Sequence, residues 1–159
     1  MRFAVNYLAG FLLTRLLQPI LVASAPARIV HVASAGQAPL DFVDVMLTRN
    51  YSGVRAYCQS KLAQIMFTFD LAEQLAAARV TANALHPATY MPTKIVATPV
   101  SSIADGVHAT ARLVTAPQLD TVTGGYYNGT RDARAHEQAY DPLARARLRE
   151  ISERLTSRS

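Results

Sequence analysis

Residues 28–34 read RIVHVAS, a short run of apolar and β-branched residues flanked by Pro26 and Gly36. Such a run predicts a β-strand that is buried on both faces, the form that strands take in parallel sheets. A second run, RVTANALHP, predicts a strand over 79–85 that is stopped by Pro87. The stretch GGYYNGT further along the chain predicts a short third strand.

Helical patterns separate these strands. Residues 3–22 are strongly apolar, residues 52–78 carry apolar side chains at helical spacing behind a predicted N-cap at Ser52, and 101–116 is helical again. Asp141 followed by Pro142 predicts the start of a last helix. Strands that alternate with long helices indicate an α/β fold with a parallel sheet. Three strands are few for such a sheet, so we expect residues 1–159 to form a single partial domain.

The composition suits a globular α/β domain, with 50% hydrophobic and 17% charged residues. Much of the net charge of +5 lies after residue 130, where arginines alternate with acids. That pattern is typical of a solvated helix face, and we expect no nucleic-acid partner. The single Cys58 excludes an internal disulfide and favours a reducing, cytoplasmic location.

The first segment, MRFAVNYLAGFLLTRLLQPILVASAPA, has two interpretations. Arg2, an apolar stretch and small residues near its end resemble a secretory signal, which would make this a secreted protein with a removed first segment. A buried first helix is the interpretation that we favour. Arg15 and Gln18 interrupt the apolar residues, so we expect no membrane span, which needs about 20 of them.

The stretch YCQSK places Tyr57 and Lys61 four residues apart, hence on one face of the predicted helix. An ammonium beside a phenol favours the ionised phenol, which assists proton transfer near neutral pH. The alternative is a core tyrosine with a lysine that reaches into solvent. Spacing alone does not decide between a catalytic pair and this structural interpretation.

Ser34 follows the first strand at its carboxyl end, where open parallel sheets bind their ligands. A hydroxyl there can donate a hydrogen bond to a developing oxyanion, although serine is also common in plain turns. VASAG faintly resembles a hydrolase nucleophile elbow but lacks its first glycine. His31 and His108 have no cysteine or carboxylate at metal-ligand spacing, so we expect no metal site.

Taken together, RIVHVAS, YCQSKLA and LHPATYMPT resemble the second half of a short-chain dehydrogenase/reductase. The long gap between Ser34 and Tyr57 is similar to that of the branch of retinol dehydrogenases and protochlorophyllide reductases. FAVNYLAGFLLTRLL is similar to the helix that carries the family's catalytic asparagine, which matches Asn6. The resemblance implies the C-terminal half of a Rossmann-type doubly wound parallel sheet, without its N-terminal βαβ units.

The resemblance also implies roles. Tyr57 would be the general acid or base, and Lys61 would tune it and bind the nicotinamide ribose. Ser34 would polarise the substrate oxygen, and Asn6 would hold a water in the proton relay, unless it is simply a polar helix residue. The reaction would move hydride between NAD(P), with NADP slightly favoured, and a small, hydrophobic alcohol or carbonyl compound.

HPATYMPT matches the segment that touches the nicotinamide in this family. It implies cofactor contacts from Pro87, Ala88, Thr89 and Thr93, together with Tyr57 and Lys61. The family's usual glycine is replaced by Ala88, which adds a methyl group near the cofactor. The loop KIVATPVSS after Thr93 would select the substrate, and its apolar residues favour a hydrophobic one.

The family's glycine-rich phosphate-binding turn is absent, since no G-x-x-x-G-x-G occurs in the chain. We therefore expect the chain to be truncated, to bind dinucleotide weakly and to be inactive alone, with the strand at 28–34 forming an exposed sheet edge. The alternative is a non-catalytic remnant or a homodimerising module. In this family, the helices that match 3–22 and 52–78 commonly pack against a second subunit.

Overall fold

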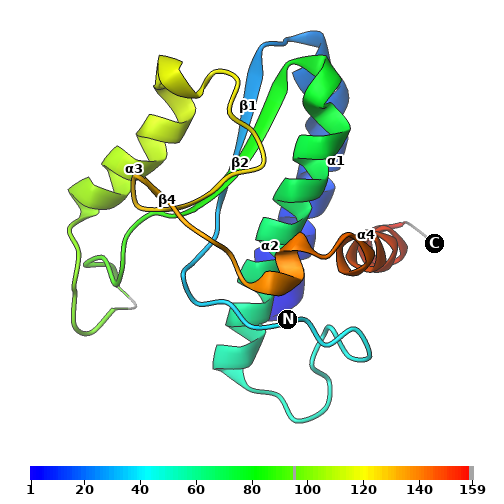
Figure 1. Cartoon of the computed structure of the whole chain (residues 1–159). Helices are drawn as coiled ribbons and strands as arrows, with labels where there is room; N and C mark the ends of the chain where they lie inside the picture. Colours follow the sequence, from blue (N-terminus) through cyan, green and yellow to red (C-terminus); the bar gives the residue numbers. More distant parts are fainter. Residues whose placement is uncertain (95, 158–159) are drawn as a thin grey trace.

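The computed structural model describes residues 1–94 and 96–157. Within these residues a four-stranded sheet carries helices on both faces (Figure 1). The strands are β1 (Ala27–Val32), β2 (Val80–His86), β3 (Tyr126–Asn128) and β4 (Arg131–Asp132). The helices are α1 (Ala9–Ala23), α2 (Gly53–Leu75), α3 (Ile103–Thr115) and α4 (Pro142–Thr156), and a π-helical turn, η1 (Ala4–Leu8), precedes α1. Short 3₁₀ turns are η2 (Ala76–Ala78), η3 (Pro117–Leu119) and η4 (Glu137–Tyr140). The predicted α/β class is confirmed.

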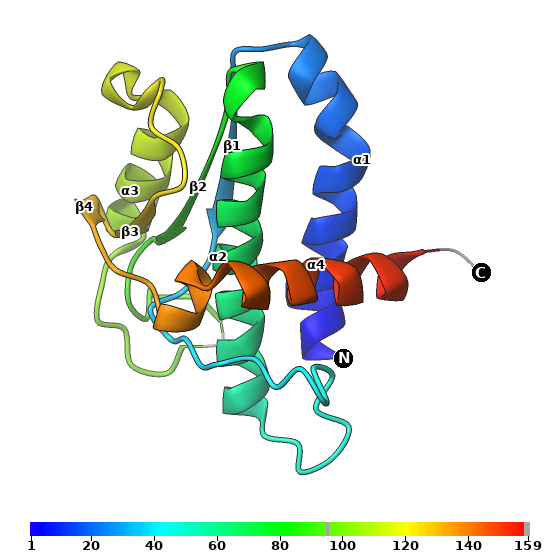
Figure 2. The same ribbon diagram turned by 45° about the vertical axis from the view of Figure 1, so that its right-hand side comes forward.

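The strands follow the order β1-β2-β3-β4. Strands β1 and β2 are parallel, with Ala27 opposite Val80, and β3 adds parallel to β2 with Tyr126 opposite Ala84. The two-residue β4 returns antiparallel to β3, a strand that the sequence analysis did not predict. Helices α1 and α2 lie on one side of the sheet and α3 lies on the other (Figure 2). This is the layered, Rossmann-like arrangement of an α/β fold.

Strand β1 departs from its prediction at its end and in its burial. It ends at Val32, so that Ser34 lies in the turn that follows rather than in the strand. Ile29 is buried but Val32 is 45% exposed, so burial on both faces is wrong for this strand. The physical reason is its position, because β1 pairs only with β2 among the described residues. The prediction of an exposed edge strand is thereby confirmed.

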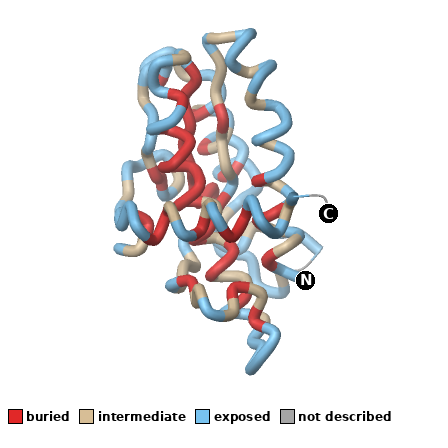
Figure 3. The backbone as a smooth tube through the Cα atoms, turned by 90° about the vertical axis from the view of Figure 1, so that its right-hand side faces the viewer, coloured by how far each residue is buried: buried red, intermediate tan, exposed pale blue. Residues whose placement is uncertain are grey.

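Helix α2 is the central element of the core. It begins where predicted, with the Ser52 hydroxyl accepting a hydrogen bond from the backbone N–H of Arg55. The whole of β2 is buried beneath the helical layer. The aromatic rings of Phe11 and Phe67, 4.8 Å apart, join α1 to α2. Buried positions concentrate along α2 and in β2, as the tube coloured by burial shows (Figure 3).

Helix α1 is the exception to the predicted burial of the first helix. Phe3 and Tyr7 at the η1 end are buried, but Phe11 is the one buried residue that α1 itself contributes. The helix continues through Pro19 to Ala23. Residues 4–23 are long and apolar enough to cross a membrane by length and composition only. Core helices and signal sequences meet the same criterion, so the absence of a span stays a prediction.

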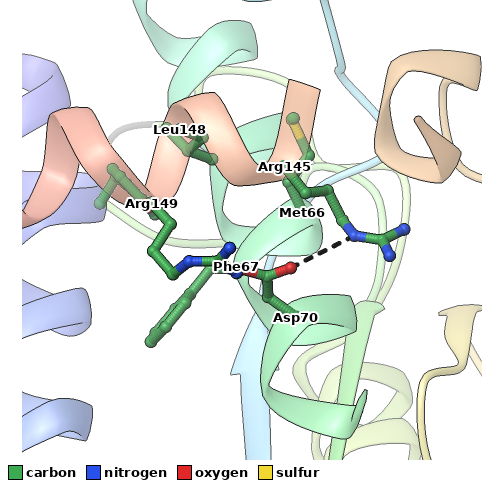
Figure 4. A pocket seen from close by; sticks show the side chains of 7 residues that line it. Met66, Phe67, Asp70, Arg145, Leu148 and Arg149 are labelled. Atoms are coloured by element: carbon green, nitrogen blue, oxygen red, sulfur yellow. Dashed lines mark hydrogen bonds and ion pairs between the residues drawn. The ribbon is translucent and has the colours of Figure 1, made fainter. Parts of the chain in front are cut away.

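Helix α4 lies crosswise over α2 and is fixed there by charge (Figure 2). The Asp70 carboxylate is buried and contacts the Arg145 guanidinium at 3.4 Å and that of Arg149 at 2.5 Å (Figure 4). Beside this cluster the Tyr7 and Ser152 hydroxyls are 2.8 Å apart. Burial raises the pKa of Tyr7 well above its usual range. The last helix therefore closes the core over α2 and η1.

Candidate active site

Tyr57 and Lys61 lie one turn apart on α2, and both side chains are half-buried. The Lys61 Nζ atom is 5.7 Å from the centre of the Tyr57 ring, within the range of a cation–π contact. The N-cap at Ser52 and the buried face of α2 fix this turn of the helix. The structure therefore brings the predicted pair together on one face, as the four-residue spacing requires.

The Lys61 ammonium is held by two acceptors. Its Nζ atom donates to the backbone carbonyl of Val32, at 2.9 Å, and to Gln64 Oε1, at 3.0 Å. Burial lowers the pKa of Lys61 below that of a free lysine, because desolvation disfavours the charged form. Val32 is the last residue of β1, so the ammonium lies at the carboxyl end of that strand.

Ser34 faces the same space as the tyrosine. A methyl group placed on Gly36 would lie 3.5 Å from Ser34 Oγ and 3.7 Å from Tyr57 Cε1, so the two side chains border one point. Ser34 Oγ accepts a hydrogen bond from the Gly36 N–H, at 3.1 Å, and its own O–H stays available as a donor. Tyr126 donates to the Ser34 carbonyl at 3.0 Å and steadies the turn.

Asn6 lies in the middle of the π-helical turn, a feature that often marks functional sites in helices. Its Nδ2 atom donates to Ser60 Oγ at 3.2 Å, and the Ser60 hydroxyl donates to the Tyr57 carbonyl at 2.7 Å. Asn6 therefore reaches the Tyr57 backbone through Ser60. Sequence reasoning missed Ser60, although it stands inside the YCQSK stretch.

The segment after β2 lines a cavity of about 310 Å³. Pro87, Ala88 and Thr89 contribute to its wall, and the Thr89 hydroxyl lies 3.0 Å from His86 Nε2. Thr93 is exposed and does not line this cavity. Ile95, in the predicted substrate-selecting loop, lies outside the described residues.

The opposite wall of this cavity comes from α3 and the β3–β4 turn, including His108 and Arg131. The sequence analysis did not select Arg131, and its exposed position among many other arginines offers no signal. Across residues 1–94 and 96–157 no three His, Cys, Asp or Glu side chains gather as metal ligands would.

This combination, a tyrosine with a lysine and a serine at the carboxyl edge of a parallel sheet, accords with the comparisons. The model of the short chain dehydrogenase family matches residues 2–102. The chain belongs to this family of oxidoreductases.

Curated relatives place the chain in the retinol-dehydrogenase-like branch. It is 36% identical over 176 residues to retinol dehydrogenase 13 of Homo sapiens, which covers 98% of the chain and 53% of that protein. It is 32% identical over 171 residues to retinol dehydrogenase 14 of Mus musculus, covering 96% and 51%. The chain thus spans about half the length of the curated relatives that it matches.

Solved structures share the fold. A crystal structure of an uncharacterised protein from Mycobacterium paratuberculosis has a TM-score of 0.74 and 28% identity, over 97% of this chain and 57% of that one. The complex of 4-hydroxyisoleucine dehydrogenase with NADH and succinate has a TM-score of 0.60 and 20% identity, over 78% and 53%. The latter supports the fold alone.

Proposed function

We propose that this chain carries the catalytic half of an NAD(P)-dependent oxidoreductase that acts on an alcohol and its carbonyl compound. The observation that carries the proposal is the approach of Ser34 Oγ and Tyr57 to one point beside Gly36, with the Lys61 ammonium held next to the tyrosine. In the proposal, a substrate oxygen between these two side chains accepts a hydrogen bond from each hydroxyl group. Carbonyl reduction needs hydroxyl donors of this kind at the carbonyl oxygen.

In this proposal Tyr57 gives a proton to the carbonyl oxygen during reduction and takes it back during alcohol oxidation. Ser34 donates a hydrogen bond to the same oxygen as negative charge develops on it. Lys61 stabilises the ionised phenol, and Asn6 orients the tyrosine backbone through Ser60. A bound nicotinamide supplies or accepts the hydride.

The residues fit one end of such a cofactor. Lys61 retains one free N–H for a ribose hydroxyl, and Pro87, Ala88 and Thr89 border a cavity of about 310 Å³ at the same edge of the sheet. Thr93 is exposed and does not line this cavity, so a contact with the nicotinamide carboxamide would have to be made from outside it. The diphosphate end lacks its glycine-rich turn in this sequence. We infer that the chain alone is inactive and binds dinucleotide weakly.

The substrate and the preferred dinucleotide are also proposals. The names of the relatives include retinol dehydrogenases, and the loop after Thr93 carries the exposed Val100, which favours a hydrophobic alcohol or carbonyl substrate. NADP is the cofactor that we favour from the resemblance to that branch. A cytoplasmic location is proposed from the free Cys58, and a chain without a membrane span is proposed from Arg15 and Gln18, which interrupt the apolar residues of the first helix.

A chimera tests the proposed activity. The amino-terminal part of human retinol dehydrogenase 13, ending before the segment that matches Asn6, is joined to this chain, and NADPH oxidation is followed with a hydrophobic aldehyde. Tyr57→Phe in the chimera should reduce kcat by about 100-fold or more, because no proton donor remains. The control Tyr51→Phe alters an exposed tyrosine outside the site. Equal rates for both variants would refute the assignment.

A second candidate function is a non-catalytic module that dimerises through residues 3–22 and 52–78. The observation that favours it is the exposed apolar side of α1, where Leu13, Leu16 and Ile20 are 58%, 69% and 61% exposed. Sedimentation equilibrium of the chain and of Leu16→Asp tests this candidate. A monomer at all concentrations in the unsubstituted chain would rule it out.

A further inference from the structure

Two hydrogen bonds hold the Lys61 ammonium and leave one of its N–H groups free. An ammonium group has three N–H donors. The Val32 carbonyl and Gln64 Oε1 take one each, at 2.9 and 3.0 Å. With Tyr57 on the same face at 5.7 Å, the third N–H is the one that can reach a group outside the chain. The direction of that donor is therefore set by the other two bonds.

The two acceptors belong to elements that are fastened to each other. His31 on β1 and Thr68 on α2 join these elements, with 2.8 Å between His31 Nδ1 and Thr68 Oγ1. The buried Thr68 hydroxyl donates its hydrogen to the Gln64 carbonyl at 2.7 Å, so the hydrogen between Thr68 and His31 comes from Nδ1. The backbone of Gln64 is thus fixed relative to Val32, one residue along β1 from His31.

We propose that Gln64 is a positioning residue for Lys61, which fixes where the ammonium stands and where its free N–H points. This inference rests on the proposed function, in which Lys61 serves the tyrosine and a dinucleotide ribose. A neutral amide oxygen orients the ammonium and leaves its full charge beside Tyr57. A carboxylate in the same place would orient it equally but would neutralise the charge.

The surroundings of Lys61 indicate that Gln64 has the dominant effect on the titration of its ammonium group. Tyr57 is the titratable side chain in contact with the ammonium, and His31 on β1 reaches it only through Thr68. Among the described residues no carboxylate forms an ion pair with Lys61. Burial lowers the pKa of Lys61, so each remaining acceptor has a large influence on its titration.

The test uses the lysines themselves, because the chain contains only Lys61 and Lys94. The protein is labelled with ¹³C-lysine, and the Cε chemical shifts are followed by NMR from pH 7 to 12. Lys94 is exposed and serves as an internal reference. Gln64→Leu should move the Lys61 midpoint down by about one pH unit, since an acceptor to a charged group is lost. Gln64→Glu should move it up by a similar amount.

Gln74→Glu is the matched control, since it makes the same change on the same helix at an exposed residue that hydrogen-bonds Arg15. It should leave the Lys61 midpoint in place. Unchanged Lys61 midpoints in both Gln64 variants, with native circular dichroism, would overturn the inference. The readout needs neither cofactor nor turnover, so an inactive chimera with shifted Lys61 midpoints would refute the proposed function and leave the role of Gln64 standing.

Discussion

Helices α1 and α2 lie on the same side of the sheet and are both rich in apolar residues, yet their burial is opposite. In α2, 14 of 23 residues are buried, and this helix supplies Tyr57, Lys61 and Gln64. In α1, Phe11 alone of 15 residues is buried. The difference shows that the side chains of the proposed site depend on contacts within the chain, whereas the apolar side of α1 has no cover among the described residues.

The two edges of the described sheet also differ in how they are covered. Beyond β3, the antiparallel β4 closes the sheet, while β1 has β2 on one side only. The apolar side of α1 and the open edge of β1 are thus both uncovered among the described residues. Tyr57 and Ser34 are held in place without that cover by contacts within the described residues.

The largest effect is expected at the well-covered side, in the ion cluster that holds α4 on α2. Asp70→Asn should lower the free energy of unfolding by about 3 kcal/mol, because the buried Arg145 loses its buried charged partner. Glu73→Gln is the matched control, since Glu73 is 66% exposed and pairs with the same Arg145. It should cost less than about 1 kcal/mol. Urea unfolding measures both, and equal losses would contradict a dominant role for Asp70.

The next effect is a change of stability with pH, and it tests the hydrogen bond between His31 on β1 and Thr68 on α2. Burial lowers the pKa of His31 to about 4, below the usual 6.5. The folded state therefore binds fewer protons than the unfolded state between these values, and stability falls as pH falls through 6.5 until it levels off near 4. We expect a loss of about 2 kcal/mol, less than the full shift implies, since solvent screens a half-buried ring.

His31→Asn isolates this contribution from that of carboxylates, such as Asp44 and Asp105, whose pKa values are also lowered by hydrogen bonds. Its stability should change less between pH 7 and pH 4 than that of the unsubstituted chain. Thermal unfolding at matched ionic strength measures the difference. Parallel pH profiles for the two proteins would show that His31 titrates normally in the fold.

The features that the sequence predicts correctly are those that depend on residues close together in the chain. The caps at Ser52 and Asp141 and the main strands of the sheet follow from residue type and periodicity, and Tyr57 and Lys61 follow from helical spacing. The end of β1 was misplaced because Ala33 and Ser34 are small residues that give no break signal, although the register with β2 ends at Val32. Local pattern does not report where pairing ends.

Long-range contacts could not be read from the sequence. The link from Asn6 to Ser60 depends on a π-helical turn, and the bond from Lys61 to Val32 joins residues far apart in the chain. The same holds for Asp70 and Arg145, which are separated by three strands and a helix. The burial of α1 was wrongly predicted because apolar composition does not reveal what covers a helix.

The smallest effect is expected for proline at Val30, on the open edge of β1, and it tests whether that edge is free in solution. The N–H groups of Ala27 and Ala33 bond to carbonyls of β2 and its flank. Because alternate residues of a strand point to opposite edges, the N–H of Ile29 also faces β2 and that of Val30 faces outward. Proline removes an N–H, so its cost depends on which of these edges is paired.

We therefore compare proline with alanine at each position, which cancels the loss of the side chain. At Ile29 the proline variant should be less stable than the alanine variant by about 3 kcal/mol, since a ladder hydrogen bond is lost. At Val30 the same difference should stay below about 1 kcal/mol in urea unfolding. A difference at Val30 as large as that at Ile29 would mean that another strand, from a second copy of the chain, already pairs with β1 in solution. The exposed side of α1 would then be part of an interface rather than an uncovered surface.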